Sequence, residues 1–211
     1  SCNVFFYEVG YQLGLNGDKY DQDLGNEKLA KYASMYGLNE KSGIEIEESE
    51  PQISDALSVV SAIGQGTNNF TTVGLARYVT TVANSGTCYD LTLLDKVTDT
   101  SGNLLVNYSA NVRNTIDMPQ SYWNAIHQGM RGVVQNKKYY QDFGVEVAGK
   151  TGTAEEDKSR PNHGLFVGYA PYDNPEVSMA IRIANGYSSD YACQLSKQLM
   201  TVYFDLDENG A

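Results

Sequence analysis

The sequence predicts an α+β fold, and two observations carry this prediction. Up to Gly86 the chain consists mainly of stretches whose apolar residues recur at helical spacing. The C-terminal half instead contains three consecutive strand candidates followed by one helix. Strands that follow one another without intervening helices favour an antiparallel sheet with helices packed against it. At 211 residues, without internal repeats or long linkers, the chain is expected to form one domain with two lobes.

Four helices are expected in the first lobe. Residues 4–14 lack clean alternation and predict a mostly buried helix. In NEKLAKYASMYGL, Asn26 can cap a second helix that Gly37 ends. A third helix is predicted from Asp55 to Ile63, and a fourth over TVGLARYVTTVANSG with Gly86 as its stop signal. The acidic stretch GIEIEESEPQ predicts a surface loop or a brief strand.

The second lobe is expected to combine a hairpin, a sheet and two helices. Two apolar runs flank TDTSGN and predict a β-hairpin, and SYWNAIHQGMRGVVQ has helical spacing. The last helix is predicted from about Asp190 to Phe204. Residues 1–90 are thus a mainly helical lobe, and residues 91–211 hold the rest. The three predicted strands are Val145–Thr153, Gly164–Ala170 and Val177–Ile183.

Composition excludes several classes of function. The chain has 15 basic and 26 acidic residues, and its net charge of -11 repels phosphate backbones, so nucleic acid is not an expected partner. The longest apolar stretch, ALSVVSAIG, is far shorter than the roughly 20 residues that cross a bilayer. Cys2, Cys88 and Cys193 lack CxxC spacing and are interpreted as free thiols, although one disulfide stays open. No residues have metal-ligand spacing, so neither a metal nor a cofactor is expected.

Two short motifs carry the chemistry. Ser1-Cys2-Asn3 opens the chain, and Lys150-Thr151-Gly152-Thr153 lies within VAGKTGTAEE. Alone, the first could be a helix cap and the second a strand end with a glycine bulge. Their order, together with SAIGQGTNNFTTVGLARYVTTVANSGT and HGLFVGYAPYDNPEVSMAIRI, resembles the transpeptidase domain of penicillin-binding proteins. The resemblance extends over nearly the whole chain and to the superfamily that includes the serine β-lactamases.

This resemblance implies a serine acyltransferase, in which a serine attacks a peptide or β-lactam carbonyl to form an acyl-enzyme. It implies that Ser1 shuttles a proton to the leaving nitrogen and that Asn3 binds the substrate amide. These two residues lie on one wall of the active-site cleft by this resemblance. On the opposite wall of the cleft, the resemblance implies that Lys150 supplies positive charge near Ser1 and the substrate carboxylate.

The rest of that wall has binding roles by the same resemblance. The hydroxyls of Thr151 and Thr153 bind the substrate carboxylate, and Gly152 leaves room for the acyl chain. The backbone N–H of Thr153 is one of two oxyanion donors. The other donor belongs to the nucleophile.

The nucleophile itself is missing. In the family it lies in a Ser-x-x-Lys turn upstream of Ser-x-Asn, and no serine of this chain has a lysine three residues later. The chain is therefore expected to be the C-terminal portion of such a domain, incomplete at its N-terminus and inactive alone. The strand Val177–Ile183 would lose its upstream neighbour, so self-association or pairing with the upstream fragment is expected there.

The resemblance predicts a D,D-transpeptidase that cross-links peptidoglycan stem peptides and is acylated by β-lactam antibiotics. It would act at the extracytoplasmic face of the bacterial cell membrane, with an anchor upstream. Two alternatives stay open: a D,D-carboxypeptidase or other hydrolase of the same fold, and a non-catalytic penicillin-binding or sensor domain. His163 is predicted to be an exposed strand-end residue, and His127 a structural or surface residue.

Overall fold

A three-stranded antiparallel sheet forms the centre of the protein, for which a computed structural model describes residues 2–206. Its strands are β7 (Ala148–Ala154), β8 (His163–Ala170) and β9 (Val177–Ile183), in the order β7-β8-β9. The three predicted strands are confirmed, although β7 begins three residues later than predicted. The α+β prediction is confirmed as well.

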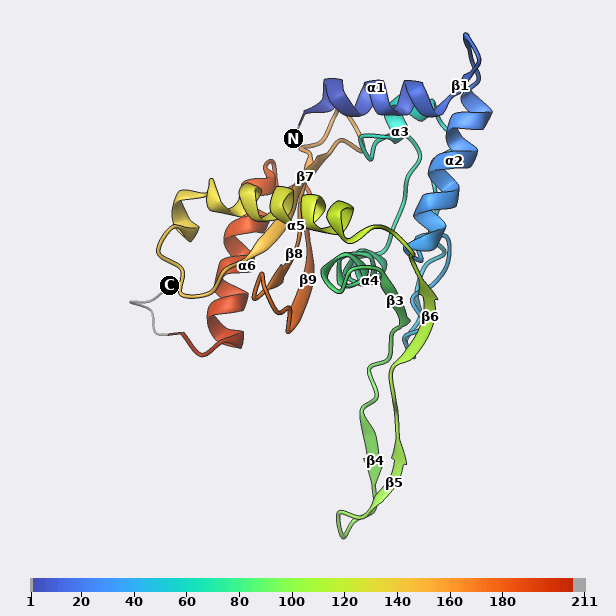
Figure 1. Ribbon diagram of the computed structural model, residues 1–211. Helices are drawn as coiled ribbons and strands as arrows, with labels where there is room; N and C mark the ends of the chain where they lie inside the picture. Colours follow the sequence, from blue (N-terminus) through green and yellow to red (C-terminus); the bar gives the residue numbers. More distant parts are fainter. Residues whose placement is uncertain (1, 207–211) are drawn as a thin grey trace.

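Three helices surround this sheet. α6 (Ser189–Tyr203) and α4 (Thr72–Ala83) pack on the strands, and α5 (Gln120–Gln135) packs against β7 (Figure 1). Strand alternation explains the two faces, because neighbouring residues point to opposite sides. Apolar side chains from both faces are fully buried. The α6 side contains Val134, Val147, Phe166, Ala192 and Met200, and the α4 side contains Val79, Ala148 and Tyr169.

The N-terminal helices are α1 (Asn3–Leu13), α2 (Gln22–Met35) and the short α3 (Ser58–Ser61). A two-residue hairpin, β1 (Leu15–Asn16) and β2 (Lys19–Tyr20), joins α1 to α2. Three details of the prediction were wrong: the cap of α2, the length of α3 and the burial of α1.

The cap of α2 is Asp21, whose carboxylate accepts hydrogen bonds from the backbone N–H groups of Asp23 and Leu24. Asn26 lies inside the helix, and its amide donates to the carbonyl of Ala56. α3 covers only four residues, and no side chain caps its N-terminus. In α1, only Gly10 is buried.

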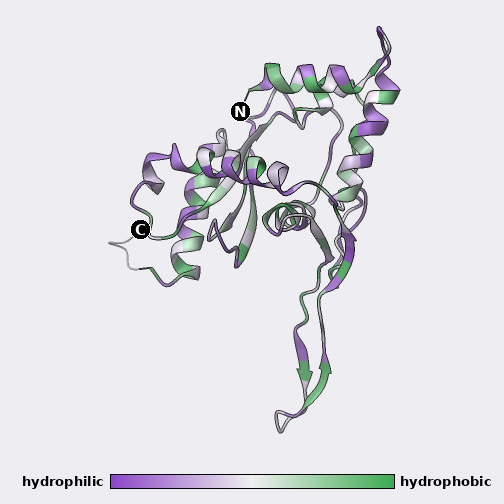
Figure 2. Cartoon of the chain, viewed as in Figure 1, coloured by the Kyte–Doolittle hydropathy of each residue, from purple (hydrophilic) through white to green (hydrophobic). Residues whose placement is uncertain are grey.

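A long two-part hairpin projects from the body of the molecule (Figure 1). β3 (Thr87–Asp90) pairs with β6 (Asn111–Thr115), and farther out β4 (Lys96–Thr98) pairs with β5 (Leu104–Asn107). The prediction of a hairpin around TDTSGN is confirmed. Figure 2 shows hydrophobic segments along it, and every residue of β4 and β5 is exposed. Within residues 2–206, no helix has the length and hydropathy needed to cross a bilayer, and all three cysteines are free thiols.

Candidate functional site

The segment Lys150–Thr153 lies in β7, at one end of the strand order. Its residues pair in register with β8, from Lys150 opposite Val167 to Thr153 opposite Gly164. Alternation along the strand places Lys150 and Gly152 on one face and the two threonines on the other. A ligand that contacts all four residues must therefore lie along the outer edge of β7, where no described strand pairs with it.

Lys150 is an available cation at this edge. Its side chain is exposed, and Nζ donates a hydrogen bond to the backbone oxygen of Thr151 at 2.6 Å. The surrounding protein partly desolvates the amine and so lowers its pKa below the usual value for lysine. No carboxylate within residues 2–206 forms an ion pair with Lys150. The charge can thus be offered to an anionic ligand.

Two glycines of β7 differ in what surrounds them. A Cβ atom at Gly149 would lie 2.3 Å from Cζ of Phe166, so the core requires a glycine there. A Cβ atom at Gly152 would meet only Leu165, with its Cβ at 3.4 Å, which is an ordinary van der Waals distance. Core packing therefore does not require Gly152. Gly152 therefore leaves out a side chain at a position where packing would accept one.

The two residues of the first motif are not joined to this strand in the described structure. Ser1 lies outside the described residues. Asn3 is exposed and begins α1, and no hydrogen bond or ion pair within residues 2–206 links it to Lys150–Thr153. The structure therefore brings the four residues of the second motif together and leaves their relation to the first motif as a prediction.

The two histidines have structural partners. His163 is only 7% exposed, so the prediction of an exposed residue was wrong. Its Nε2 lies 2.6 Å from a carboxylate oxygen of Glu156, a contact across a loop that no sequence pattern indicated. His127 lies with Nε2 2.8 Å from the carbonyl oxygen of Val82, which agrees with the predicted structural role.

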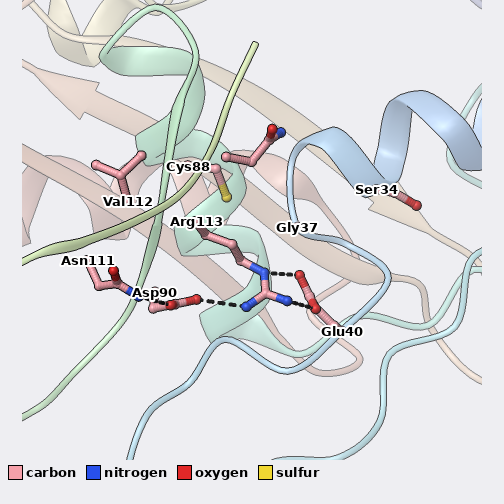
Figure 3. Close-up of a pocket in the computed structure, with 9 residues that line it drawn as sticks. Ser34, Gly37, Glu40, Cys88, Asp90, Asn111, Val112 and Arg113 are labelled. Carbon is pink, nitrogen blue, oxygen red and sulfur yellow. Dashed lines mark hydrogen bonds and ion pairs between the residues drawn. The ribbon is translucent and has the colours of Figure 1, made fainter.

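A separate pocket lies at the base of the hairpin (Figure 3). Its volume is about 440 Å³, and no residue of β7 lines it. Arg113 of β6 bridges Glu40 and Asp90 there; the guanidinium lies 3.1 Å from the Asp90 carboxylate and also bonds to that of Glu40. These two carboxylates hold the pKa of Arg113 above its usual value. At this pocket, Arg113 thus links the hairpin to the segment after α2 through two ion pairs.

The described residues contain no assembled nucleophile. The serine hydroxyls that form hydrogen bonds do so with carboxylates, carbonyls, backbone amides and other hydroxyls, and within residues 2–206 none is hydrogen-bonded to a lysine or histidine. Within the same range, no three His, Cys, Asp or Glu side chains gather in a geometry that could hold a metal ion. The described residues therefore form one side of a ligand-binding site and do not include the reacting group.

Comparison with known proteins gives one family. Residues 1–201 match the family described as penicillin binding protein transpeptidase domain. Penicillin-binding protein 2A of Bacillus subtilis is 28% identical over 98% of this chain and 33% of its own length. Peptidoglycan D,D-transpeptidase MrdA of Haemophilus influenzae is 26% identical over 97% of this chain and 35% of its own length. The chain spans about a third of the length of these relatives.

Solved structures agree in fold. Penicillin-binding protein 2B of Streptococcus pneumoniae strain R6 superposes with a TM-score of 0.83 at 22% identity, covering 98% of this chain and 38% of that protein. The imipenem acyl-enzyme complex of penicillin-binding protein A from Mycobacterium tuberculosis gives a TM-score of 0.81 at 20% identity, covering 96% and 45%. At these identities the likeness shows the fold.

Proposed function

Because the chain belongs to the penicillin-binding protein transpeptidase family, we propose that it is the C-terminal part of a D,D-transpeptidase domain that cross-links peptidoglycan stem peptides. The observation that carries this proposal is the exposed Lys150 on the edge of β7, which forms no ion pair within residues 2–206 and lies beside a glycine that packing does not require. The parent protein would act at the extracytoplasmic face of a bacterial membrane, held by an anchor outside this chain.

The residues of β7 have distinct roles in this proposal. Lys150 attracts the substrate carboxylate, and the hydroxyls of Thr151 and Thr153 hydrogen-bond to it. The backbone N–H of Thr153 stabilises the oxyanion that forms when the carbonyl is attacked. Gly152 leaves room for the acyl chain. Ser1 would pass the proton to the leaving nitrogen and Asn3 would bind the substrate amide, once an upstream segment supplies the acylated serine.

The chain alone is proposed to be inactive because it needs a second segment to complete its fold. No described strand pairs with the outer edge of β9, which leaves a row of backbone donors and acceptors unpaired. On α1, Val4 is 75% exposed and Phe5 60% exposed. We propose that the upstream part of the protein, or a second copy of the chain, covers the edge of β9.

The first experiment compares the chain with the full-length protein. Both are incubated with a labelled penicillin and analysed by intact-mass spectrometry. The full-length protein is expected to gain one penicillin per molecule and the chain none, because the chain lacks the acylated serine. A stoichiometric adduct on the chain alone would contradict the proposed truncation, and no adduct on either would contradict the proposed function.

The second experiment tests the strand. In the full-length protein, Lys150→Ala and Thr151→Val are expected to slow acylation by about 10²-fold, the order seen when one transition-state partner is removed. Melting temperatures are expected to stay within a few degrees of the parent's. Unchanged acylation rates in both variants would show that β7 is the wrong strand.

A third experiment separates the alternatives within the fold. The acyl-enzyme formed from a D-Ala-D-Ala peptide can be released by an amine or by water. A transpeptidase transfers the acyl group to an added D-amino acid, whereas a carboxypeptidase releases the free acid. A sensor domain would be acylated without turnover of the peptide.

A further inference from the structure

A buried histidine connects the two loops at the end of the β7 strand. His163 begins β8 opposite Ala154, the last residue of β7. One of these loops is the segment 155–162, which follows the Lys-Thr-Gly-Thr motif. The other is the turn 184–188 between β9 and α6. The imidazole contacts both.

The hydrogen bonds assign the tautomer of this ring. The backbone N–H of Asn185 donates to Nδ1 at 3.0 Å. A backbone N–H cannot accept, so Nδ1 carries no proton and the ring proton is on Nε2. Nε2 then donates to the carboxylate of Glu156 at 2.6 Å. The guanidinium of Arg182 lies beside the ring, with Nη2 3.2 Å from Nε2. His163 thus bridges the two loops through both of its ring nitrogens.

The turn 184–188 is held closely against the start of β8. The backbone N–H of Tyr187 donates to the carbonyl of Asn162 at 3.0 Å. A Cβ atom at Gly164 would lie 2.4 Å from the backbone oxygen of Ser188, so only glycine permits this approach. Asn185 and Tyr187 have φ angles of 52° and 61°, in the left-handed region that surrounding contacts must maintain. These contacts hold the turn 184–188 in one conformation against the start of β8.

The loop 155–162 depends on that turn. Its residues from Glu155 to Arg160 are all exposed. Within residues 2–206, the bond from Glu156 to His163 is the only side-chain hydrogen bond that joins this loop to the rest of the protein. Without this bond, the segment directly after Thr153 would have no side-chain hydrogen bond to hold it in place.

We propose that His163 is a positioning residue for acylation, which fixes the loop after the Lys-Thr-Gly-Thr motif through Glu156 and the rigid turn through Asn185. This inference rests on the proposed function. A misplaced loop would move the end of β7, where Thr153 is proposed to supply the oxyanion donor. Displacements of about 1 Å at such a site can reduce rates about 10²-fold.

Two substitutions separate the two bonds of the bridge. An asparagine carbonyl can take the place of Nδ1, so His163→Asn keeps the bond to Asn185 and loses the one to Glu156. A glutamine amide reaches the place of Nε2, so His163→Gln keeps the bond to Glu156. Glu156→Ala removes the bond to His163 at an exposed residue, where substitution is expected to cost little stability, and Glu156→Gln keeps the acceptor. Glu155→Ala, next to it, is the matched control.

The test measures three quantities in the full-length protein: the second-order rate of acylation by a fluorescent penicillin, amide exchange in 155–162 and 184–188, and the melting temperature. His163→Asn and Glu156→Ala are expected to speed exchange in 155–162 and to slow acylation by about tenfold to 10²-fold. Glu156→Gln and Glu155→Ala should acylate within about threefold of the parent, and His163→Gln, which loses only the bond to Asn185, should slow acylation less than His163→Asn. The double variant His163→Asn/Glu156→Ala should be no slower than either single variant, because both remove one bond.

Two outcomes would overturn the positioning role. One is faster exchange in 155–162 with unchanged acylation. The other is equal slowing in the Asn and Gln variants together with a lower melting temperature, which would show a purely structural histidine. If the parent protein itself is not acylated, the proposed function fails, and that failure is visible before any variant is compared.

Discussion

The sheet layer and the N-terminal helices differ in how they are stabilised. Every buried apolar side chain in the described residues lies between Val79 and Met200, and most of them are in or against the sheet. The segment before Val79 contributes none, and its buried side chains are polar. These are Ser42, Ser54, Ser58 and Arg77.

The difference shows which part of the described chain buries its apolar side chains among its own residues. In the sheet layer the hydrophobic effect is satisfied internally, since residues such as Phe166 and Tyr169 are fully removed from water. The N-terminal region is held by hydrogen bonds instead. Arg77, for example, donates to the carbonyls of Gly37, Glu40 and Lys41. Its helix α1 keeps a large apolar surface in water, as is typical of a surface that another polypeptide covers.

The largest expected effect tests this contrast directly. Phe166→Ala should lower the free energy of unfolding of the chain by about 3–5 kcal/mol, because it creates a cavity in a fully buried cluster. Phe5→Ala, at a residue that is 60% exposed, should change it by less than about 0.5 kcal/mol. Urea unfolding midpoints measure both. Equal destabilisation would mean that α1 is buried in solution, by self-association for instance.

A smaller effect separates packing from function within a single strand. Gly149→Ala should destabilise the protein by about 1–3 kcal/mol, because its Cβ would overlap the ring of Phe166. Gly152→Ala should leave unfolding nearly unchanged and slow acylation of the full-length protein, since its Cβ would occupy the open face of β7. Thermal melts and acylation rates give the two readouts. A strong loss of stability at Gly152 would assign that glycine to the core.

The sequence predicted the sheet layer well because local pattern and tertiary packing agree there. The strands β7, β8 and β9 and the helix α6 lie where apolar spacing predicts them. The apolar stripe of α6 is only partly buried, because Ala192 is buried whereas Leu195, Leu199 and Val202 are exposed. The prediction failed for α1. Apolar residues on all sides indicate burial, but among the described residues this helix packs mainly on α2 and α3. A pattern of apolar residues shows that a helix needs a packing partner, but it does not show which part of the protein supplies that partner.

The site shows the same limit. Lys150–Thr153 could be recognised because four adjacent residues carry the motif. The bridge from Glu156 through His163 to Asn185 joins three segments that only the fold brings together. Arg113 joins Glu40 and Asp90 in the same long-range way. The capping of α2 by Asp21 was missed because Asn26, five residues later, is an equally good capping residue by type.

The hairpin offers a third, weaker contrast, between its base and its tip. Arg113→Ala removes the bonds to Glu40 and Asp90 at the base and should cost at most about 1 kcal/mol of stability, since its side chain is 39% exposed. Lys96→Ala breaks a 4.0 Å pair with Asp95 near the tip and should have almost no effect. Urea unfolding in low and high salt is the measurement. A loss at Arg113 that does not shrink in salt would point to packing rather than charge.

The smallest expected effect is confined to acidic pH and concerns how α6 is joined to the segment that follows α5. The Asp190 carboxylate accepts hydrogen bonds from Lys137 at 2.7 Å and Tyr139 at 2.9 Å. The bond from Lys137 is the main reason that the pKa of Asp190 is held below its usual value. Because the folded pKa is lowered, this carboxylate stabilises the fold above its unfolded pKa of about 4, and the contribution disappears as the pH falls through the folded pKa.

Asp190→Asn should therefore be less stable than the parent near neutral pH, and the two should converge as the pH falls below about 4. Asp142→Asn, at an exposed residue in the same region, is the control and should follow the parent throughout. Melting temperatures measured across this pH range show whether the charge of Asp190 stabilises the fold. If the gap between Asp190→Asn and the parent stays constant with pH, the side chain acts through packing or helix capping, and its charge does not fasten α6.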